Sequence, residues 1–167
     1  MVDNGWDLYL LDLEEGGSTP LIVSEGNQEF AAISPDGRWL AYESDENGTD
    51  QIIVREFPDV EGGRWQVSRV GGQDPVWSQD SRDLYFRLPG EILAVAIGTE
   101  PTFTYGPPMR AFDATGFLQS QLSYAIAPDG NRALLIKDAT QSDSGDIPPI
   151  IVIENWFEEL EALVPVE

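Results

Sequence analysis

The sequence predicts an all-β fold made of repeated antiparallel units. Three segments share one pattern, in which an apolar strand, a tight turn around an Asp and a second apolar strand follow one another: residues 30–42, 75–86 and 124–136. The turn centres Asp36, Asp80 and Asp129 are separated by 44 and then 49 residues. A period of about 40–50 residues is typical of the four-stranded blades of a β-propeller.

The turn residues explain why each hairpin closes locally. They are Ser34, Pro35, Asp36 and Gly37 in the first copy, Asp80 in the second, and Pro128, Asp129 and Gly130 in the third. Pro presets φ, the Asp side chain hydrogen-bonds to backbone amides ahead of it, and Gly supplies a positive φ. In the second copy Gln79 and Ser81 replace Pro and Gly, so that this turn departs from the pattern while Asp80 is kept.

Further apolar runs complete the units. Third and fourth strands are expected at residues 7–13, 19–23, 51–57, 64–70, 92–97, within 103–112, and at 149–155. Pro107 and Pro108 interrupt the pattern of the strand within 103–112. Residues 156–163 alone have helical spacing of apolar residues, with Asn155 as the N-cap and Pro165 after the end.

These strands amount to about three blades. We expect one partial propeller domain over residues 1–167, with units at 1–25 (partial), 29–71, 74–113 and 122–156 (partial) and a tail at 157–167. Closed propellers have typically 4–8 blades, and an open ring would expose strand edges. Either the chain is a fragment of a longer propeller, or two copies form a homodimer with C2 symmetry that closes a six-bladed ring.

The composition excludes several classes of function. The chain of 167 residues has 30 acidic and 9 basic residues, a net charge of −21, and neither Cys nor His. Phosphate binding needs Lys and Arg, so nucleic-acid binding is not expected, and the charge also opposes anionic membranes. Disulfides, thiolate metal sites, imidazole bases and Ser-His-Asp triads are excluded. The charge favours a basic partner or divalent cations, or serves solubility alone.

No segment reads as a membrane anchor. The longest apolar run, residues 150–153, is far shorter than the roughly 20 residues of a membrane helix, and the N-terminus lacks the pattern of a signal peptide. We therefore expect a soluble chain without membrane insertion, and its compartment stays open.

Acidic residues are expected on one face of the propeller, where the loops between the second and third strands meet the loops between blades. The members are Asp45, Glu46, Asp50, Asp74, Asp113, Asp138, Asp143 and Asp146. They could bind a cationic partner, or they could be ordinary polar loop residues, which is the simpler interpretation.

Asp45, Asn47 and Asp50 resemble part of a calcium loop, because oxygen ligands alternate along it. The loop has Asp50 where a calcium loop has its glycine, and a hairpin turn at Asn47-Gly48 explains the same residues. We therefore expect no metal site and no cofactor.

Aromatic residues at repeat positions are expected to pack between blades; they are Trp39, Tyr42, Trp77, Tyr85, Phe86 and Tyr124. Trp6, Trp65 and Trp156 lie outside the repeated motif, so they are the candidates for an exposed contact.

The sequence Ile33-Ser-Pro-Asp-Gly-Arg-Trp-Leu-Ala-Tyr42 resembles the repeat of the TolB-type, WD-repeat-like β-propeller family. Weaker versions occur at 76–86 and 126–136, and residues 151–160 resemble the end of propellers that follow bacterial Ser/Thr kinase domains. The resemblance implies the fold, but propellers carry many functions.

We therefore expect a non-enzymatic scaffold that binds a protein or peptide. One alternative is the propeller portion of a larger hydrolase or Ser/Thr kinase sensor, with catalysis elsewhere. The other is Ca²⁺-dependent ligand binding in the propeller channel.

Overall fold

The computed structural model describes residues 5–100, 102–117 and 123–137, and these residues form strands and turns without a helix. The strands are β1 (Leu8–Leu11), β2 (Ser18–Ile22), β3 (Gln28–Ile33), β4 (Trp39–Ser44), β5 (Gln51–Glu56), β6 (Arg64–Gln66), β7 (Gln73–Trp77), β8 (Asp83–Leu88), β9 (Glu91–Gly98), β10 (Thr104–Tyr105), β11 (Met109–Asp113), β12 (Tyr124–Ile126) and β13 (Ala133–Leu135). The all-β class predicted from the repeats is confirmed.

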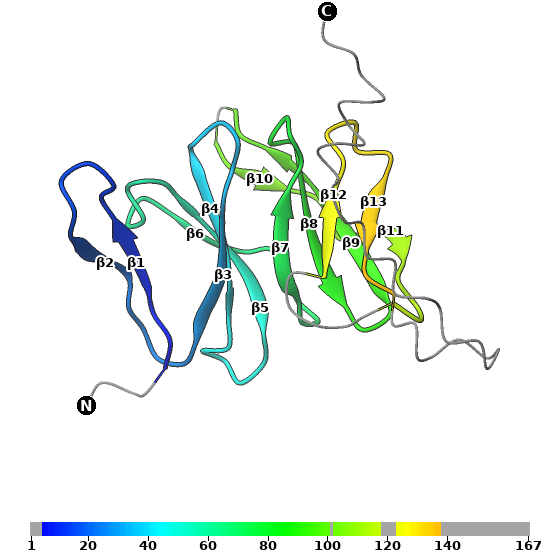
Figure 1. Cartoon of the computed structure of the whole chain (residues 1–167), viewed down its shortest axis with the longest axis horizontal. Coiled ribbons are helices and arrows are strands. Elements are labelled where there is room, and N and C mark those ends of the chain that lie inside the picture. The colour runs from blue at the N-terminus through cyan, green and yellow to red at the C-terminus, as the bar shows by residue number, and fades with distance from the viewer. Residues whose placement is uncertain (1–4, 101, 118–122, 138–167) are drawn as a thin grey trace, which may run out of the picture. The chain divides into compact units, whose positions relative to one another are not determined.

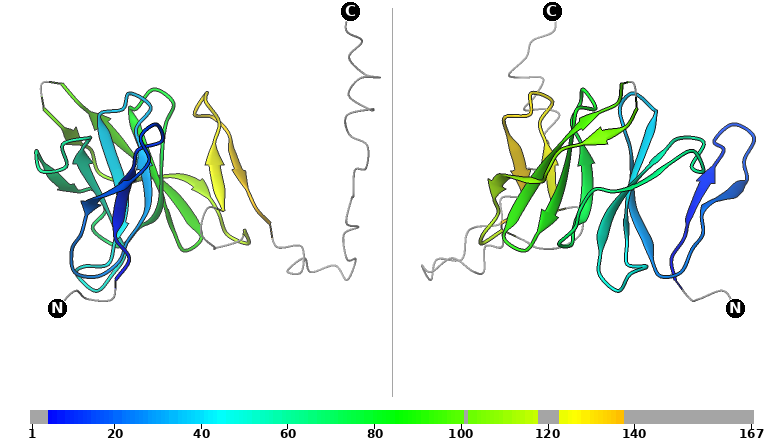
Figure 2. Two further views of the ribbon diagram at one scale, coloured as in Figure 1. Left: turned by 60° about the vertical axis from the view of Figure 1, so that its left-hand side comes forward. Right: turned by 180° about the vertical axis from the view of Figure 1, so that it is seen from behind.

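Every sheet is antiparallel and is built from strands that follow one another in sequence. The first sheet pairs β1 with β2, the second has the order β3-β4-β5-β6, and the last pairs β12 with β13. In the third, β7, β8 and β9 are neighbours, and both β10 and β11 pair with β9. Figure 1 shows the four sheets one after another in chain order, and Figure 2 shows the same order from behind.

The predicted hairpin turns are held by their Ser and Asp side chains. In the first turn, Ser34 Oγ donates to Asp36 Oδ1 (2.5 Å), Trp39 N donates to Ser34 Oγ (3.0 Å), and Gly37 N donates to Ser34 O (2.8 Å). The second turn repeats this arrangement with Ser78 and Asp80, where Ser78 Oγ donates to Asp80 Oδ1 (2.7 Å).

Ser81 takes the place of the turn glycine in the second hairpin. It adopts a φ of 60°, so a non-glycine residue occupies the left-handed conformation that the turn requires. Its hydroxyl also accepts a hydrogen bond from Asp36 N (3.2 Å), which ties the second turn to the first. This contact explains how the turn keeps its shape without the Pro and Gly of the motif.

The core consists of three layers, because the middle strands bury both of their faces. In β4, Trp39 and Ala41 face the β7–β9 sheet, while the alternating Leu40 and Tyr42 pack with Ile22 of β2. Side chains alternate between the two faces of a strand, so one buried strand can contribute to two layers.

Strand β8 repeats this pattern in the next sheet. Its Leu84 and Phe86 are completely buried against the β3–β6 sheet, while Tyr85 packs with Tyr124 of β12. Apolar side chains on both faces therefore hold the sheets together in series. Among the predicted packing aromatics, Trp39, Tyr42, Trp77, Tyr85, Phe86 and Tyr124 are all buried.

Two expected strands differ from the prediction. The strand expected at 64–70 ends at Gln66, because the chain then turns toward β7. The strand within 103–112 is divided into β10 and β11, and Pro107 and Pro108 lie between the two parts. The strand at 149–155 and the helix at 156–163 lie outside the described residues.

The two-stranded sheets at either end of the described region expose apolar side chains. Tyr9, Leu11 and Leu13 are exposed in or next to β1, and Leu134 and Ile136 are exposed in or next to β13. Neither β1 nor β13 has a second neighbour among the described strands. The number of blades and the closure of the ring stay predictions.

No helix in the described part of the chain is long and apolar enough to cross a membrane.

Candidate functional site

Three connections meet at one end of the two central sheets and surround a hollow. They are the β4–β5 connection, the β6–β7 connection and the β8–β9 turn. The Ser-Asp hairpins lie at the opposite end of the same two sheets. We call this end the loop face. The cavity, named here the loop-face hollow, has a volume of about 630 Å³ and is lined by Gly48, Thr49, Asp50, Arg69, Val70, Gly71, Gly72, Gln73, Arg87, Leu88 and Pro89.

The backbone of the β6–β7 connection lies directly against the core at the base of this hollow. Gly72 is buried, and a side chain there would meet Ile52 Cγ1 at 2.9 Å and Phe86 Cδ2 at 3.0 Å. Glycine is required because nothing larger fits without displacing core residues. The β6–β7 connection can therefore lie directly on the core, and the hollow opens above it.

A buried ion pair fixes one wall of the hollow. Arg87 Nε on β8 donates to Asp74 Oδ2 on β7 (2.9 Å), and these side chains are 6% and 1% exposed. Arg87 Nη2 also donates to Gln73 Oε1 (2.7 Å), and Gln73 Nε2 donates to Asp50 Oδ2 (2.5 Å). These bonds link the β4–β5 connection with β7 and β8 through polar side chains at the hollow.

Two further groups join this network through the backbone of Asp74. Tyr124 Oη of β12 donates to Asp74 O (2.6 Å), and Asp74 N donates to Glu43 Oε2 of β4 (3.2 Å). Asp74 itself has a φ of 53°, an uncommon conformation for a non-glycine residue. The network thus holds Asp74 from three sheets and supports its unusual backbone.

Glu43 has a strongly altered affinity for protons. Burial raises the pKa of Glu43 to about 7; the hydrogen bond from Asp74 N opposes this, and the nearby carboxylates of Asp50, Asp74 and Glu29 add to it. A carboxyl group with this pKa is partly protonated near neutral pH, so the charge beside the hollow changes with pH.

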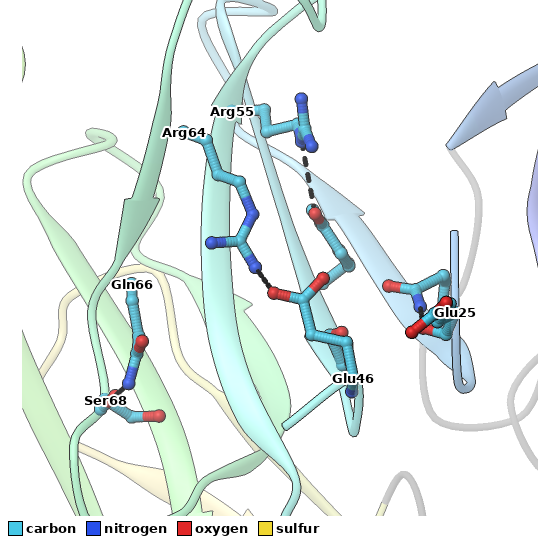
Figure 3. Close-up of polar contacts among 9 residues, drawn as sticks. Glu25, Glu46, Arg55, Arg64, Gln66 and Ser68 are labelled. Atoms are coloured by element: carbon cyan, nitrogen blue, oxygen red, sulfur yellow. Dashed lines mark hydrogen bonds and ion pairs between the residues drawn. The ribbon is translucent and has the colours of Figure 1, made fainter. Parts of the chain in front are cut away.

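The acidic residues expected on the loop face are engaged with neighbours. Asp45 Oδ1 and Oδ2 accept from Asn27 N (2.5 Å) and Asn27 Nδ2 (2.7 Å), and Glu46 forms an ion pair with Arg64. Figure 3 shows Arg64 extending from β6 toward Glu46 in the β4–β5 connection. These carboxylates therefore fasten connections to their own sheet.

The expected placement of Asp74 on an acidic surface is wrong. Asp74 is buried because Arg87 provides a matching charge inside the molecule. Asp113 is exposed and accepts from Arg110 Nη2 (2.7 Å) and Thr115 N (2.9 Å). Asp138, Asp143 and Asp146 lie outside the described residues.

The weak calcium candidate has its side chains directed to other partners. Both carboxylate oxygens of Asp45 bind Asn27, Asp50 accepts from Gln73, and Asn47 is exposed. Within residues 5–100, 102–117 and 123–137, no group of three acidic side chains is arranged to hold a metal ion.

The tryptophans expected at an exposed contact behave differently from one another. Trp6 is 67% exposed, whereas Trp65 is partly buried and packs on Phe103 with ring centroids 4.6 Å apart. The exposure expected for Trp65 is therefore wrong, because Phe103 from the following unit covers it. Trp156 lies outside the described residues.

Arg69, Gln73 and Arg87 lie at the hollow although the sequence did not indicate them as residues of a site. Arg69 is exposed and has no ion-pair partner among the described residues. Arg87 could have been noticed, because an arginine within the apolar run of β8 needs a buried partner. The hollow itself could not be predicted from the sequence, because its three connections are distant from one another along the chain.

No model of a known protein family matches the chain. An uncharacterized protein of Agrobacterium fabrum is 38% identical over 50 residues, which are 30% of this chain and 17% of that protein. The matched region is therefore a small part of that relative.

Solved structures resemble a larger part of the chain. A protein described as a TolB from Agrobacterium tumefaciens has a TM-score of 0.52 and 19% identity, covering 79% of this chain and 56% of that one. TolB from Acinetobacter baumannii has a TM-score of 0.48 and 18% identity, and the match covers 76% of this chain and 36% of that one. A structure from a study of two prolyl endopeptidases has a TM-score of 0.48 and 23% identity, and the match covers 74% of this chain and 21% of that one.

The first of these structures shows the fold. This chain has the β-propeller fold that the repeated motif predicted, and it spans about half the length of that TolB structure.

Proposed function

We propose that this chain is a non-catalytic β-propeller scaffold that binds a protein or peptide in the loop-face hollow. The hollow of about 630 Å³ is the observation that carries the proposal. Its volume lies in the range of about 300–1,000 Å³ that is typical of ligand sites. The buried Asp74–Arg87 pair gives it a preorganised wall, which lowers the entropic cost of binding.

The lining suits an extended segment of polypeptide. Gly48 and Gly71 leave the backbone uncovered by side chains of their own, and Arg69 can donate to a carbonyl or carboxylate. Val70 is 77% exposed at the hollow and offers an apolar contact. A peptide can use both kinds of contact, because its backbone is polar and its side chains include apolar groups.

The net charge acts on the approach of the partner. The chain carries −21, which attracts a basic protein over long distances. At the hollow itself, Arg69 and Arg87 offset Asp50 and Asp74. We therefore propose that charge raises the association rate, while the polar and apolar contacts of the hollow determine affinity.

The proposal places catalysis outside this chain. The sequence contains neither His nor Cys, and at the hollow Arg87 is paired with Asp74 while Asp50 accepts a hydrogen bond from Gln73. A propeller portion of a larger hydrolase or kinase sensor would use the same hollow for binding, with its catalytic groups on another part of the protein.

The test selects a random peptide library on the full chain and measures the recovered peptides by calorimetry. We expect Arg69→Glu and Val70→Asp each to weaken binding by about tenfold or more, since hot-spot contacts contribute about 1.4 kcal/mol or more. Arg132→Glu is the matched control, because Arg132 is also an exposed arginine but lies in the β12–β13 turn. Peptides that bind all variants equally would contradict the proposal.

A further inference from the structure

A second cavity lies at the end of the central sheets that carries the Ser-Asp hairpins. It has a volume of about 370 Å³ and is lined by Arg38, Trp39, Glu56, Phe57, Pro58, Asp59, Trp65, Thr99, Thr102 and Phe103. None of these residues belongs to the loop-face hollow. We call it the aromatic cavity.

Three aromatic rings form one wall of the aromatic cavity. Trp39 and Phe103 have ring centroids 4.7 Å apart, Trp65 and Phe103 are 4.6 Å apart, and Trp39 and Trp65 meet edge to face at 5.7 Å. Packing fixes the positions of these rings, so the wall is rigid. The face of an aromatic ring is electron-rich and attracts a cation.

Two carboxylates without a basic partner stand beside the rings. Glu56 lies directly opposite Trp39 in the β4–β5 pair, and Asp59 follows in the next connection. Neither forms an ion pair with any Lys or Arg of the described residues. Arg38 is the cation of the lining, and it is paired with Glu100 (3.1 Å). The cavity therefore has an excess of negative charge.

The chain itself already places a guanidinium on this wall. The Arg38 guanidinium carbon lies 5.7 Å from the ring centroid of Trp39. Arginine stacks on aromatic faces and pairs with carboxylates, so rings beside two carboxylates that lack a basic partner suit a second guanidinium. The wall thus has the chemistry that an arginine side chain requires.

The indole N–H of Trp39 lies beneath the accessible surface of this wall. Trp39 is 4% exposed, and its Nε1–H is buried with no acceptor among the described residues. This atom is closed to solvent and so does not bond to a ligand, but its resonance reports on a charge brought to the neighbouring rings.

We propose that the aromatic cavity binds an arginine side chain of a basic peptide. Glu56 and Asp59 pair with the guanidinium, and Trp65 and Phe103 contact its planar face. This inference gives the proposed scaffold a second binding site and names the chemistry of a partner for it.

The test uses a capped peptide of alternating glycine and arginine, with a citrulline version as the uncharged control. Titration of the full chain is followed by NMR at the indole N–H resonance of Trp39, assigned with Trp39→Phe. We expect this resonance to move with the arginine peptide, and citrulline to weaken binding by about tenfold or more because citrulline lacks the positive charge. Equal binding of both peptides, or no movement of the resonance, would overturn the proposal.

Variants separate this site from a general effect of charge. Glu56→Gln combined with Asp59→Asn should weaken the arginine peptide by about tenfold or more, whereas Glu61→Gln, an exposed acid in the same connection, should not. An equal loss of affinity in the double variant and in Glu61→Gln would mean that only the net charge matters, and it would refute the site. Arg69→Glu, which tests the loop-face hollow, should leave this titration unchanged, so the two proposals can fail separately.

Discussion

Glu43 is the residue whose protonation the fold alters most clearly at an ordinary pH. The pKa of its side chain rises from 4.5 to about 7 on folding, so the folded chain binds a proton more tightly than the unfolded chain does. The free energy of unfolding should therefore fall as pH rises from 4.5 to about 7. Above that range the contribution of Glu43 to it should no longer change with pH.

Substitution Glu43→Gln tests this assignment. The amide keeps an oxygen for Asp74 N but cannot ionise, so the variant should be more stable than the parent chain at about pH 8 and little different at about pH 5. Thermal unfolding at both pH values measures the difference. A difference that is independent of pH would show that Glu43 is not the titrating group.

The Asp74–Arg87 pair should contribute far more to stability than an exposed pair. Arg87→Ala leaves Asp74 buried without its partner, so we expect a loss of about 3–5 kcal/mol in the free energy of unfolding in urea. Arg110→Ala removes the exposed pair with Asp113 and should cost less than about 1 kcal/mol. Similar losses for both would contradict the structural role given to the buried pair.

At the scale of elements, the hairpin turn depends on backbone conformation more than on packing. Gly37 has a φ of +72°, and a methyl group there would meet no atom within 4 Å. Gly37→Ala should therefore cost about 1–2 kcal/mol through strain alone.

Gly106→Ala is the control for this turn, because a methyl group there makes ordinary contacts at 3.8 Å and the backbone is not in the left-handed region. Urea unfolding of both variants gives the comparison. Equal stability of the two variants would mean that the turn does not require a positive φ.

The strands and turns could be predicted from sequence because their signals are local. The Ser34-Pro35-Asp36-Gly37 turn and the alternation of β4 each lie within a few consecutive residues. The burial of Asp74 depends on Arg87, 13 residues away on the neighbouring strand, and the cover on Trp65 comes from Phe103 in the next unit. Such contacts depend on how sheets pack, which the repeat pattern does not specify.

At the scale of the whole molecule, the exposed apolar residues of the two terminal sheets need a cover. We propose that Leu11 of the β1–β2 sheet and Leu134 of the β12–β13 sheet are covered either by a second copy of the chain or by the rest of a longer propeller. A homodimer that closes one ring is the form open to this chain by itself.

Sedimentation equilibrium distinguishes the two forms of closure. A homodimer would have twice the 18.4 kDa mass of the chain, and it should weaken when Leu11 and Leu134 are replaced by Lys. A stable monomer at micromolar concentration would refute the homodimer and leave closure to a longer chain.

Site-specific cross-linking shows whether a polypeptide binds in the loop-face hollow. The chain has no cysteine, so Val70→Cys provides a single attachment point at the hollow for a photoreactive group. Met109→Cys provides the control, because Met109 is also exposed, at 70%, and lies on β11 away from the lining. We expect peptides selected on the unmodified chain to cross-link at position 70 and not at position 109. Equal labelling at both positions, or labelling at 109 alone, would show that the peptides do not bind in the loop-face hollow.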